Sequence, residues 1–207
     1  MSAAELIPYE QPGDGAWTVV ALHATGADEM QLVPLARDLA PGAAILAPRG
    51  TEMEDGVTRR FFRRRGMTDL DLDDLRERAD ELAHALGERL DAAGRDRSRT
   101  VALGYSNGAN IALGMMFRHR GLFGGAVLLR PMLPYRPDDV ADLSGVSVLV
   151  AAGEADPFSP PAMTEELVAV LRDAGADVSL AMQPAGHEVT RADLEAAAGW
   201  FRARTGA

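Results

Sequence analysis

Two hydrophobic periods alternate along the chain. Short apolar runs are separated by longer segments in which apolar residues recur every three or four positions. The first pattern is typical of strands buried on both faces, and the second of helices with one apolar face. Their alternation predicts an α/β fold with a mainly parallel central sheet and helices on both faces. Because no internal repeat or low-complexity linker interrupts the pattern, residues 1–207 are expected to form a single domain.

The apolar runs and the periodic segments predict the following elements. Strands are expected at residues 16–23, 43–48, 100–105, 124–130, 146–152 and 177–183. Helices are expected at residues 28–40, 69–93, 107–119, 162–174 and 190–203. Leu75, Ala79, Leu82 and Leu86 form one stripe in the second helix, and Gly94 suits its end. The segment ELIPYE, residues 5–10, predicts a short edge strand, and no connection is long enough for a large lid.

The run ALGYSNGANIAL, residues 102–113, lies where a predicted strand gives way to a helix. Ser106 stands between Gly104 and Gly108. In a sharp strand-to-helix turn, a side chain at either glycine would clash, and the serine oxygen points outward beside the helix N-terminus. The N–H groups and dipole of that terminus favour developing negative charge. The pattern therefore indicates a nucleophilic serine, with a chance tight turn as the alternative.

A nucleophilic serine needs a base, and four histidines compete for this role. His84 lies inside a predicted helix, and His119 closes the helix after Ser106. His23 ends the first predicted strand at the correct edge of the sheet and stays an alternative. His187, in the loop QPAGHEVT after the last strand, is favoured because it follows Ser106 in the chain and its loop opens at the same edge.

The base in turn needs an orienting carboxylate. The loop after the 146–152 strand, within VLVAAGEADPFSP, carries Glu154 and Asp156. Asp156 is favoured because its spacing clears the strand end, although an aspartate before Pro157 also suits a plain turn. The polar loop with Asp138, Asp139 and Asp142 is expected to be solvated.

The chain order Ser106, Asp156, His187 resembles that of the α/β-hydrolase superfamily. The segment LHATGADEMQLVPLA is similar to one in its small carboxylesterase branch, which includes phospholipase/carboxylesterase-type enzymes and acyl-protein thioesterases. The segments PRGTEMEDGVTRRFFRR, GYSNGANIA, PMLP and AGEADPFSP resemble bacterial hydrolases linked to hydroquinone and catechol stress. The likeness covers about residues 17 to 200.

This resemblance implies an oxyanion hole built from the backbone N–H groups of Thr25 and Asn107, with His23 supporting the loop. One departure concerns that loop, because Ala24 and Ala27 stand where the family has glycines. A positive φ at Ala24 would strain the loop or change its shape, and would weaken the second oxyanion donor.

The cluster RRFFRRR, residues 59–65, has two interpretations. It is either a solvated loop with its phenylalanines packed inward, or a pocket wall. In the second case Phe61 or Phe62 contacts the acyl or aryl group, and an arginine attracts an anionic substituent. Met132 and Leu133 are expected in the same pocket or in the core, and His23 is a further pocket candidate.

The composition limits the classes of binding partner that we expect for this protein. The formal net charge is −10, and all 21 basic residues are arginines. An acidic chain is a poor partner for nucleic acid or anionic membranes, and no apolar run is long enough to span a bilayer. The start of the chain lacks the pattern of a secretory signal, so the cytoplasm is the expected location. Without cysteine there is no disulfide or thiolate metal site, and neither a metal nor a cofactor is implied.

The expected function is hydrolysis of small carboxylic esters through an acyl-enzyme at Ser106, with a small-molecule ester as partner. One alternative is an acyl-thioesterase or lysophospholipase-like enzyme with the same machinery. Another is a non-catalytic ligand-binding protein on a hydrolase scaffold. The oligomeric state stays open, with a homodimer as one alternative.

Overall fold

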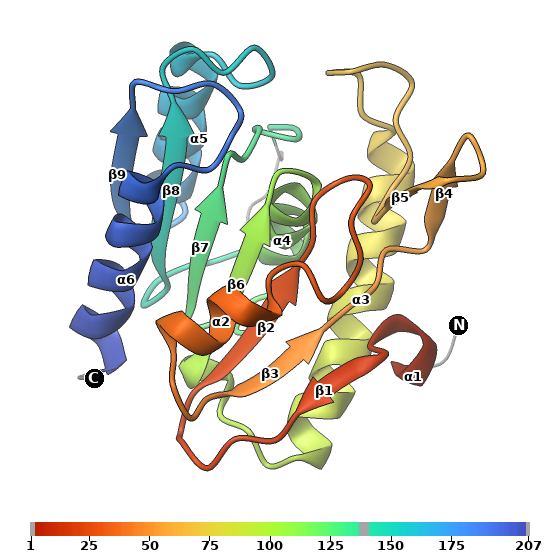
Figure 1. Cartoon of the computed structure of the whole chain (residues 1–207), viewed down its shortest axis with the longest axis vertical. Helices are drawn as coiled ribbons and strands as arrows, with labels where there is room; N and C mark the ends of the chain where they lie inside the picture. Colours follow the sequence, from red (N-terminus) through yellow and green to blue (C-terminus); the bar gives the residue numbers. More distant parts are fainter. Residues whose placement is uncertain (1–2, 137–140, 206–207) are drawn as a thin grey trace.

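The computed structural model describes residues 3–136 and 141–205, and its centre is a seven-stranded sheet (Figure 1). Its strands are β1 Tyr9–Gln11, β2 Thr18–Leu22, β3 Ala44–Ala47, β6 Thr100–Tyr105, β7 Gly125–Leu129, β8 Ser147–Gly153 and β9 Asp177–Gln183. The strand order is β1-β3-β2-β6-β7-β8-β9. β1 runs antiparallel to β3, and all other neighbours are parallel. The predicted mainly parallel sheet is confirmed.

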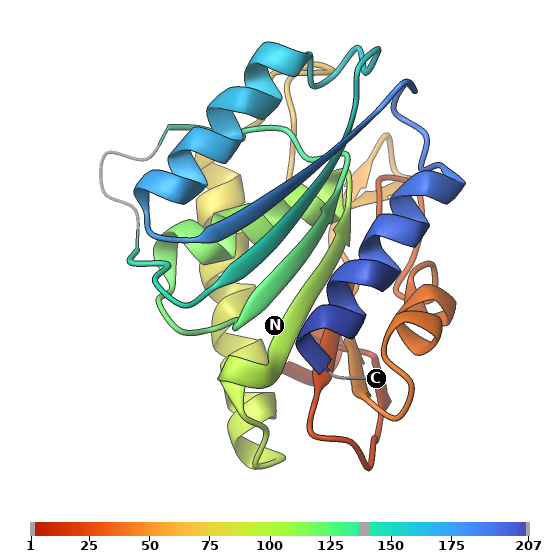
Figure 2. The same cartoon turned by 90° about the vertical axis from the view of Figure 1, so that its left-hand side faces the viewer.

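Helices cover both faces of this sheet (Figure 2). One face carries α1 Ala3–Leu6, α3 Leu72–Ala92, α4 Asn107–Arg118 and α5 Pro161–Asp173, and the other carries α2 Val33–Leu39 and α6 Arg191–Thr205. Successive β2 side chains alternate between the two layers: Val20 and Leu22 join the α3 and α4 side, whereas Val19 and Ala21 join the α2 and α6 side. Burial on both faces explains why the central strands read as unbroken apolar runs.

Two expected elements have different bounds. The predicted helix 28–40 forms only from Val33, because residues before it make turns in which the Asp28 side chain accepts the Met30 N–H. The segment 5–10 is only partly a strand, since α1 ends at Leu6 and β1 begins at Tyr9. Leu6, at the end of α1, and Ile7, which follows it, are buried in the core.

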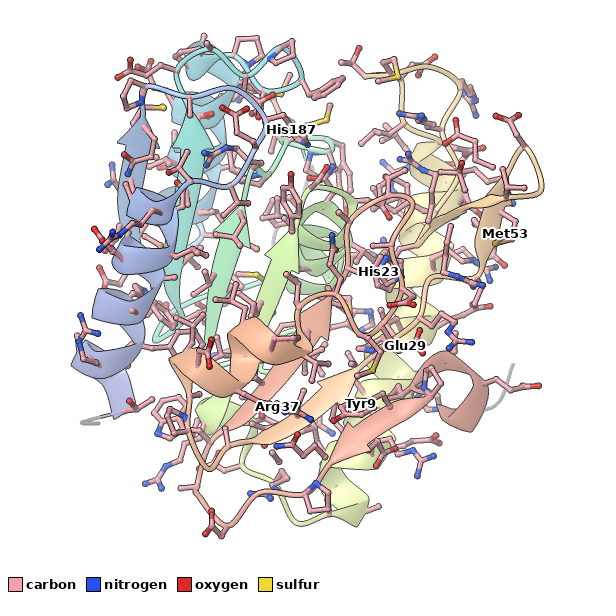
Figure 3. The ribbon with its side chains drawn as sticks, viewed as in Figure 1. Tyr9, His23, Glu29, Arg37, Met53 and His187 are labelled. Atoms are coloured by element: carbon pink, nitrogen blue, oxygen red, sulfur yellow. The ribbon has the colours of Figure 1, made fainter. Side chains whose placement is uncertain are left out.

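A small antiparallel hairpin lies beside the main sheet and was not predicted. It pairs β4 Glu52–Glu54 with β5 Thr58–Arg60. Its turn contains Asp55 and Gly56, both with positive φ, which is the Asp-Gly signal of a tight hairpin. Met53 points outward from β4 (Figure 3) and is 43% exposed. Arg60, the last residue of β5, lines the same cavity as Ser106.

A short 3₁₀ helix, Arg97–Arg99, leads directly into β6. Within residues 3–136 and 141–205, no helix combines the length and the apolar character needed to cross a membrane.

Candidate active site

Ser106 occupies a strained turn between β6 and α4. Its φ and ψ are 52° and −112°, so it is one of the few non-glycine residues here with positive φ. A Cβ at Gly104 would lie 2.6 Å from the Gly108 carbonyl oxygen, and a Cβ at Gly108 would overlap the Leu22 carbonyl oxygen. Both glycines are therefore steric requirements of the turn, as predicted. The turn presents the serine hydroxyl at the carboxyl edge of the sheet.

Three side chains from distant parts of the sequence meet at this edge. His187 Nε2 lies 2.8 Å from Ser106 Oγ, and His187 Nδ1 lies 2.8 Å from Asp156 Oδ2. Asp156 is buried, whereas the His187 side chain is 23% exposed. Asp156 accepts a hydrogen bond from the Nδ1–H group of His187, which favours the tautomer with the proton on Nδ1. Nε2 then carries no proton and faces the Ser106 hydroxyl as a hydrogen-bond acceptor. This arrangement can move a proton from serine to histidine.

The loops after β8 and β9 hold these two side chains in place. The Phe158 N–H donates to Asp156 Oδ1 at 2.9 Å, and the Phe158 ring meets the His187 ring edge-on at 4.7 Å between centroids. The Tyr105 hydroxyl donates to the His187 carbonyl oxygen at 3.1 Å. Sequence reasoning did not single out Tyr105 or Phe158, although they stand next to Ser106 and two positions after Asp156. Their contacts restrict the imidazole to one orientation.

Thr25 and Asn107 line the same cavity as Ser106. Within the described part of the chain, neither the Thr25 nor the Asn107 N–H has a hydrogen-bond acceptor. Asn107 is the first residue of α4, where the N–H has no partner inside the helix and the helix dipole is positive. Thr25 lies in the loop after β2. These two donors suit a negatively charged oxygen.

The loop that carries Thr25 tolerates alanine at position 24. Gly26, at φ 80°, supplies the positive φ of this loop, and Ala24 does not adopt one. The Ala24 N–H donates to Gln31 Oε1 at 2.7 Å. The strain that a positive φ at Ala24 would have caused is therefore absent from this loop.

A cavity of about 320 Å³ opens directly over the serine. Its lining consists of Ala24, Thr25, Gln31, Arg60, Arg64, Met67, Leu70, Tyr105, Ser106, Asn107, Asn110, Met132, Phe158 and His187. This volume is at the lower end of the range for small-molecule sites. The cavity therefore has room for a small ligand beside the Ser106 hydroxyl.

Comparison with known proteins identifies the family. A family model described as Phospholipase/Carboxylesterase matches residues 61–203. The chain is 38% identical over 194 residues to MhqD of Bacillus subtilis (strain 168), whose name describes a hydrolase, and the match covers 94% of this chain and 96% of that protein. The chain belongs to the phospholipase/carboxylesterase family. It is by family a carboxylesterase-type hydrolase, as the sequence motifs predicted.

Solved structures of the same family share the fold. The Bacillus cereus carboxylesterase superimposes with a TM-score of 0.90 at 38% identity, over 94% of this chain and 92% of that one. A carboxylesterase from Mesorhizobium loti gives a TM-score of 0.82 at 34% identity, over 91% and 90% of the two chains. This phospholipase/carboxylesterase family member thus has the α/β-hydrolase fold, and residues 3–136 and 141–205 form no large lid.

Within the family member's site, the structure separates His187 from the other histidines. Figure 3 shows His187 on the loop after β9 and His23 at the end of β2. His23 is buried: its Nδ1 contacts the Ala24 carbonyl oxygen at 2.7 Å, and its Nε2 accepts the Gly50 N–H at 2.9 Å. Burial lowers its pKa below the ordinary value of 6.5, and the neutral ring is the form that makes both contacts.

His23 therefore supports the Thr25 loop, and the expectation that it lines the substrate pocket is corrected, because both ring nitrogens are occupied inside the protein. His84 is exposed beside Glu88, and His119 Nε2 lies 2.7 Å from Asp80 Oδ1. Neither lines the cavity over Ser106.

The aromatic and aliphatic pocket candidates divide in the same way. Met132 lines the cavity, as one of its two interpretations predicted. Phe61 and Phe62 do not, because both rings are buried in the core on the α3 and α4 side, and the His23 ring lies tilted against the Phe61 ring with 4.5 Å between centroids. Leu133 packs against that core as well. For Phe61, Phe62 and Leu133 the interpretation as inward or core packing is confirmed and the pocket interpretation is corrected, since packing against α3 and α4 draws these side chains away from the opening.

No hydrogen bond or ion pair joins Glu154 or Asp142, both of which the structure describes, to His187. Glu154 is exposed, and Asp142 is exposed beside Arg120. Asp138 and Asp139 lie outside the described residues. Among the residues that the structure describes, no three His, Asp or Glu side chains are grouped in a way that could hold a metal ion.

Proposed function

We propose that this family member hydrolyses small carboxylic esters through an acyl-enzyme formed at Ser106. The observation that carries the proposal is the continuous hydrogen-bond chain from Asp156 through His187 to Ser106, with both distances at 2.8 Å. A serine hydroxyl is a weak nucleophile, and a neutral imidazole oriented by a buried carboxylate supplies the base that it lacks. The small cavity over the hydroxyl supports a small ester as substrate.

The reaction proceeds in two displacements. His187 Nε2 accepts the Ser106 hydroxyl proton as Oγ bonds to the ester carbonyl carbon, and the resulting oxyanion accepts hydrogen bonds from the Thr25 and Asn107 N–H groups. The bond to the alcohol oxygen then breaks, and the alcohol leaves with the proton from His187. Water attacks the acyl-serine while His187 accepts a proton, which returns to Ser106 as the acid is released.

The test is the Ser106→Ala variant assayed with p-nitrophenyl acetate. We expect kcat/KM to fall by at least about a thousandfold, because the residual rate comes only from binding and the oxyanion donors. Ser179→Ala, on the exposed side of β9, is the matched control and should retain full activity. A fluorophosphonate probe should label the parent protein at Ser106 and leave Ser106→Ala unlabelled. Retained turnover in pure Ser106→Ala would refute the proposal.

The same experiment separates the two alternatives from this proposal. A ligand-binding protein without catalysis would bind esters, yet would react neither with p-nitrophenyl acetate nor with the probe. A thioesterase or lysophospholipase-like enzyme would react with the probe but would show a higher kcat/KM on long-chain thioesters or lysophospholipids than on short esters. The small cavity volume supports short esters over long acyl chains.

The proposal extends to partners and location. A small-molecule ester is the partner, and the acidic net charge of −10 supports the absence of a nucleic-acid or anionic membrane partner. We infer a cytoplasmic location, because a chain without cysteine needs no oxidising compartment to fold. A homodimer is testable by sedimentation of the pure protein.

A further inference from the structure

The cavity over Ser106 carries a charge opposite to that of the whole chain. The protein has a formal net charge of −10, yet the described residues that line the cavity include Arg60 and Arg64 and neither an aspartate nor a glutamate. A cleft lined by one sign of charge concentrates small molecules of the opposite sign. The cavity is therefore electrostatically suited to an anionic ligand.

Only two of the five arginines in residues 59–65 take part in this lining. The other three have partners elsewhere: Arg59 donates to the Gly50 carbonyl, Arg63 pairs with Asp74, and Arg65 pairs with Asp71. The side chains of Arg63 and Arg65 are 56% and 64% exposed, which is typical of a solvated surface. The fold thus separates two cavity arginines from three that have structural or surface roles.

The two cavity arginines share a single carboxylate. Arg64 Nε lies 3.0 Å from Glu54 Oε1, and Arg60 Nη1 lies 3.5 Å from Glu54 Oε2. Within this group of three, two guanidinium charges share one carboxylate charge, so one positive charge has no partner among them. Burial, followed by the charge of Arg64, lowers the pKa of Arg60, so both act against its charged form. A bound monoanion would supply the missing countercharge.

Arg60 is also held in a fixed position next to the reacting groups. Its Nε donates to the Phe62 carbonyl at 3.2 Å, and its Nη1 donates to Thr25 Oγ1 at 3.0 Å. The Thr25 N–H is one of the two proposed oxyanion donors, so the guanidinium lies beside the position of the ester carbonyl. A fixed planar guanidinium binds carboxylates in a defined orientation.

Beside polar residues such as Gln31 and Asn110, the rest of the wall includes the apolar side chains of Met67, Leu70, Met132 and Phe158. These side chains suit a short aliphatic or aromatic body between the ester group and a charged end. A ligand that lacks the charged end would leave Arg60 and Arg64 without a negatively charged ligand group to bind.

We propose that Arg60 and Arg64 form a carboxylate-binding subsite, so that the preferred substrates are small esters that carry a free carboxylate. This inference rests on the proposed ester hydrolysis and deepens it by naming the substrate class.

Matched pairs of esters test the subsite. With the carboxylate on the leaving group, 4-acetoxybenzoate is compared with its neutral methyl ester; with the carboxylate on the acyl group, monoethyl adipate is compared with ethyl heptanoate. We expect kcat/KM to be at least about tenfold higher for the anionic member of at least one pair, since a charge-assisted hydrogen bond contributes about this much or more. The pair that discriminates also shows which side of the ester faces Arg60.

Arginine variants assign the preference to the subsite. Arg64→Gln and Arg60→Gln should each lower the ratio of anionic to neutral kcat/KM by about tenfold. Arg65→Gln removes the same charge at a surface position and should leave the ratio unchanged. Thermal unfolding verifies that each variant is folded. If buried Arg60 proves necessary for folding, the Arg64→Gln variant alone tests the subsite, because the Arg64 side chain is 19% exposed.

The outcomes distinguish this inference from the proposed function. If the protein hydrolyses the neutral esters and neither pair shows a preference, or if the ratio in Arg64→Gln equals that of Arg65→Gln, the subsite is refuted while the hydrolase stands. If no ester is hydrolysed, the proposed function fails and this inference fails with it. Calorimetry of Ser106→Ala with 4-acetoxybenzoate and with its methyl ester gives a separate measure of carboxylate binding that does not depend on turnover.

Discussion

Arg130 and Asp193 form a fully buried, bidentate ion pair next to the loop that carries His187. Arg130 Nη1 and Nη2 lie 2.9 and 2.7 Å from the two Asp193 carboxylate oxygens, and both side chains are 0% exposed. Arg130 Nε also donates to the Gly186 carbonyl at 3.0 Å, immediately before His187. Burial opposes ionisation of Asp193, but hydrogen bonds from Arg130 and Thr190 outweigh it and lower its pKa. The pair thus connects β7, α6 and the loop of His187.

Removing one partner of this pair should destabilise the fold strongly. We expect Asp193→Ala to lower the free energy of unfolding by about 3–5 kcal/mol, because it leaves the Arg130 charge buried without a partner. Urea unfolding measures the change. The matched control is Glu195→Ala in the exposed Arg191–Glu195 pair, whose side chains are 92% and 64% exposed, and it should change the free energy by less than about 1 kcal/mol. Similar losses in both variants would contradict a special role for the buried pair.

Replacing the acid that orients His187 should slow the reaction without unfolding the protein. In Asp156→Asn, the amide can present an N–H to Nδ1 and so favours the wrong imidazole tautomer, and we expect kcat on p-nitrophenyl acetate to fall by about 10³–10⁴-fold. Glu154→Gln removes the same charge two positions earlier, at an exposed site, and should keep its activity. If Glu154→Gln is the slower variant, the assignment of the acid is wrong.

The turn that carries Ser106 should not accept a side chain at Gly108. A Cβ there would overlap the Leu22 carbonyl oxygen, so Gly108→Ala should cost about 1–3 kcal/mol or more and displace the serine. Gly199→Ala is the control: it lies inside α6, where an added Cβ would come no closer than 3.9 Å to Arg202, and it should stabilise the protein by about 0.5–1 kcal/mol. Urea unfolding and ester hydrolysis of both variants give the comparison, and a fully active, fully stable Gly108→Ala would contradict it.

Buried His23 should make the fold sensitive to acid. Burial lowers the pKa of His23 in the folded state below its ordinary value of 6.5. Well above pH 6.5 the ring is therefore neutral in both the folded and the unfolded protein. As the pH falls below about 6.5, the unfolded chain binds the proton first, and stability is lost progressively until the pH is below the folded-state pKa. The free energy of unfolding of the parent protein should therefore fall more between pH 7.5 and pH 5 than that of His23→Gln. Parallel curves for the two proteins would show that His23 does not contribute this pH dependence.

Much of the architecture was predictable, because burial on two faces produces a distinctive local pattern. The central strands, and helices such as α3, begin and end within a few residues of the predicted bounds. The predicted bounds are wrong where a side chain caps a turn or where an element is too short to show a hydrophobic period. Asp28 forms a turn in place of the first turns of α2, and the Asp55–Gly56 hairpin is too short for hydrophobic periodicity to reveal, although its turn dipeptide is a signal.

The sequence by itself determined the positions of the central strands, the strained Ser106 turn and the candidate groups for the site beside it. These are local properties, since glycine spacing and the order of strand and helix are written in consecutive residues. Only the tertiary structure decided which charged and aromatic side chains face the cavity. Phe61 and Arg60 are neighbours in the chain, yet packing against α3 and α4 buries the phenylalanine in the core, while the hairpin directs the arginine toward Thr25. Such a division depends on contacts between segments far apart in sequence, and no local pattern encodes it.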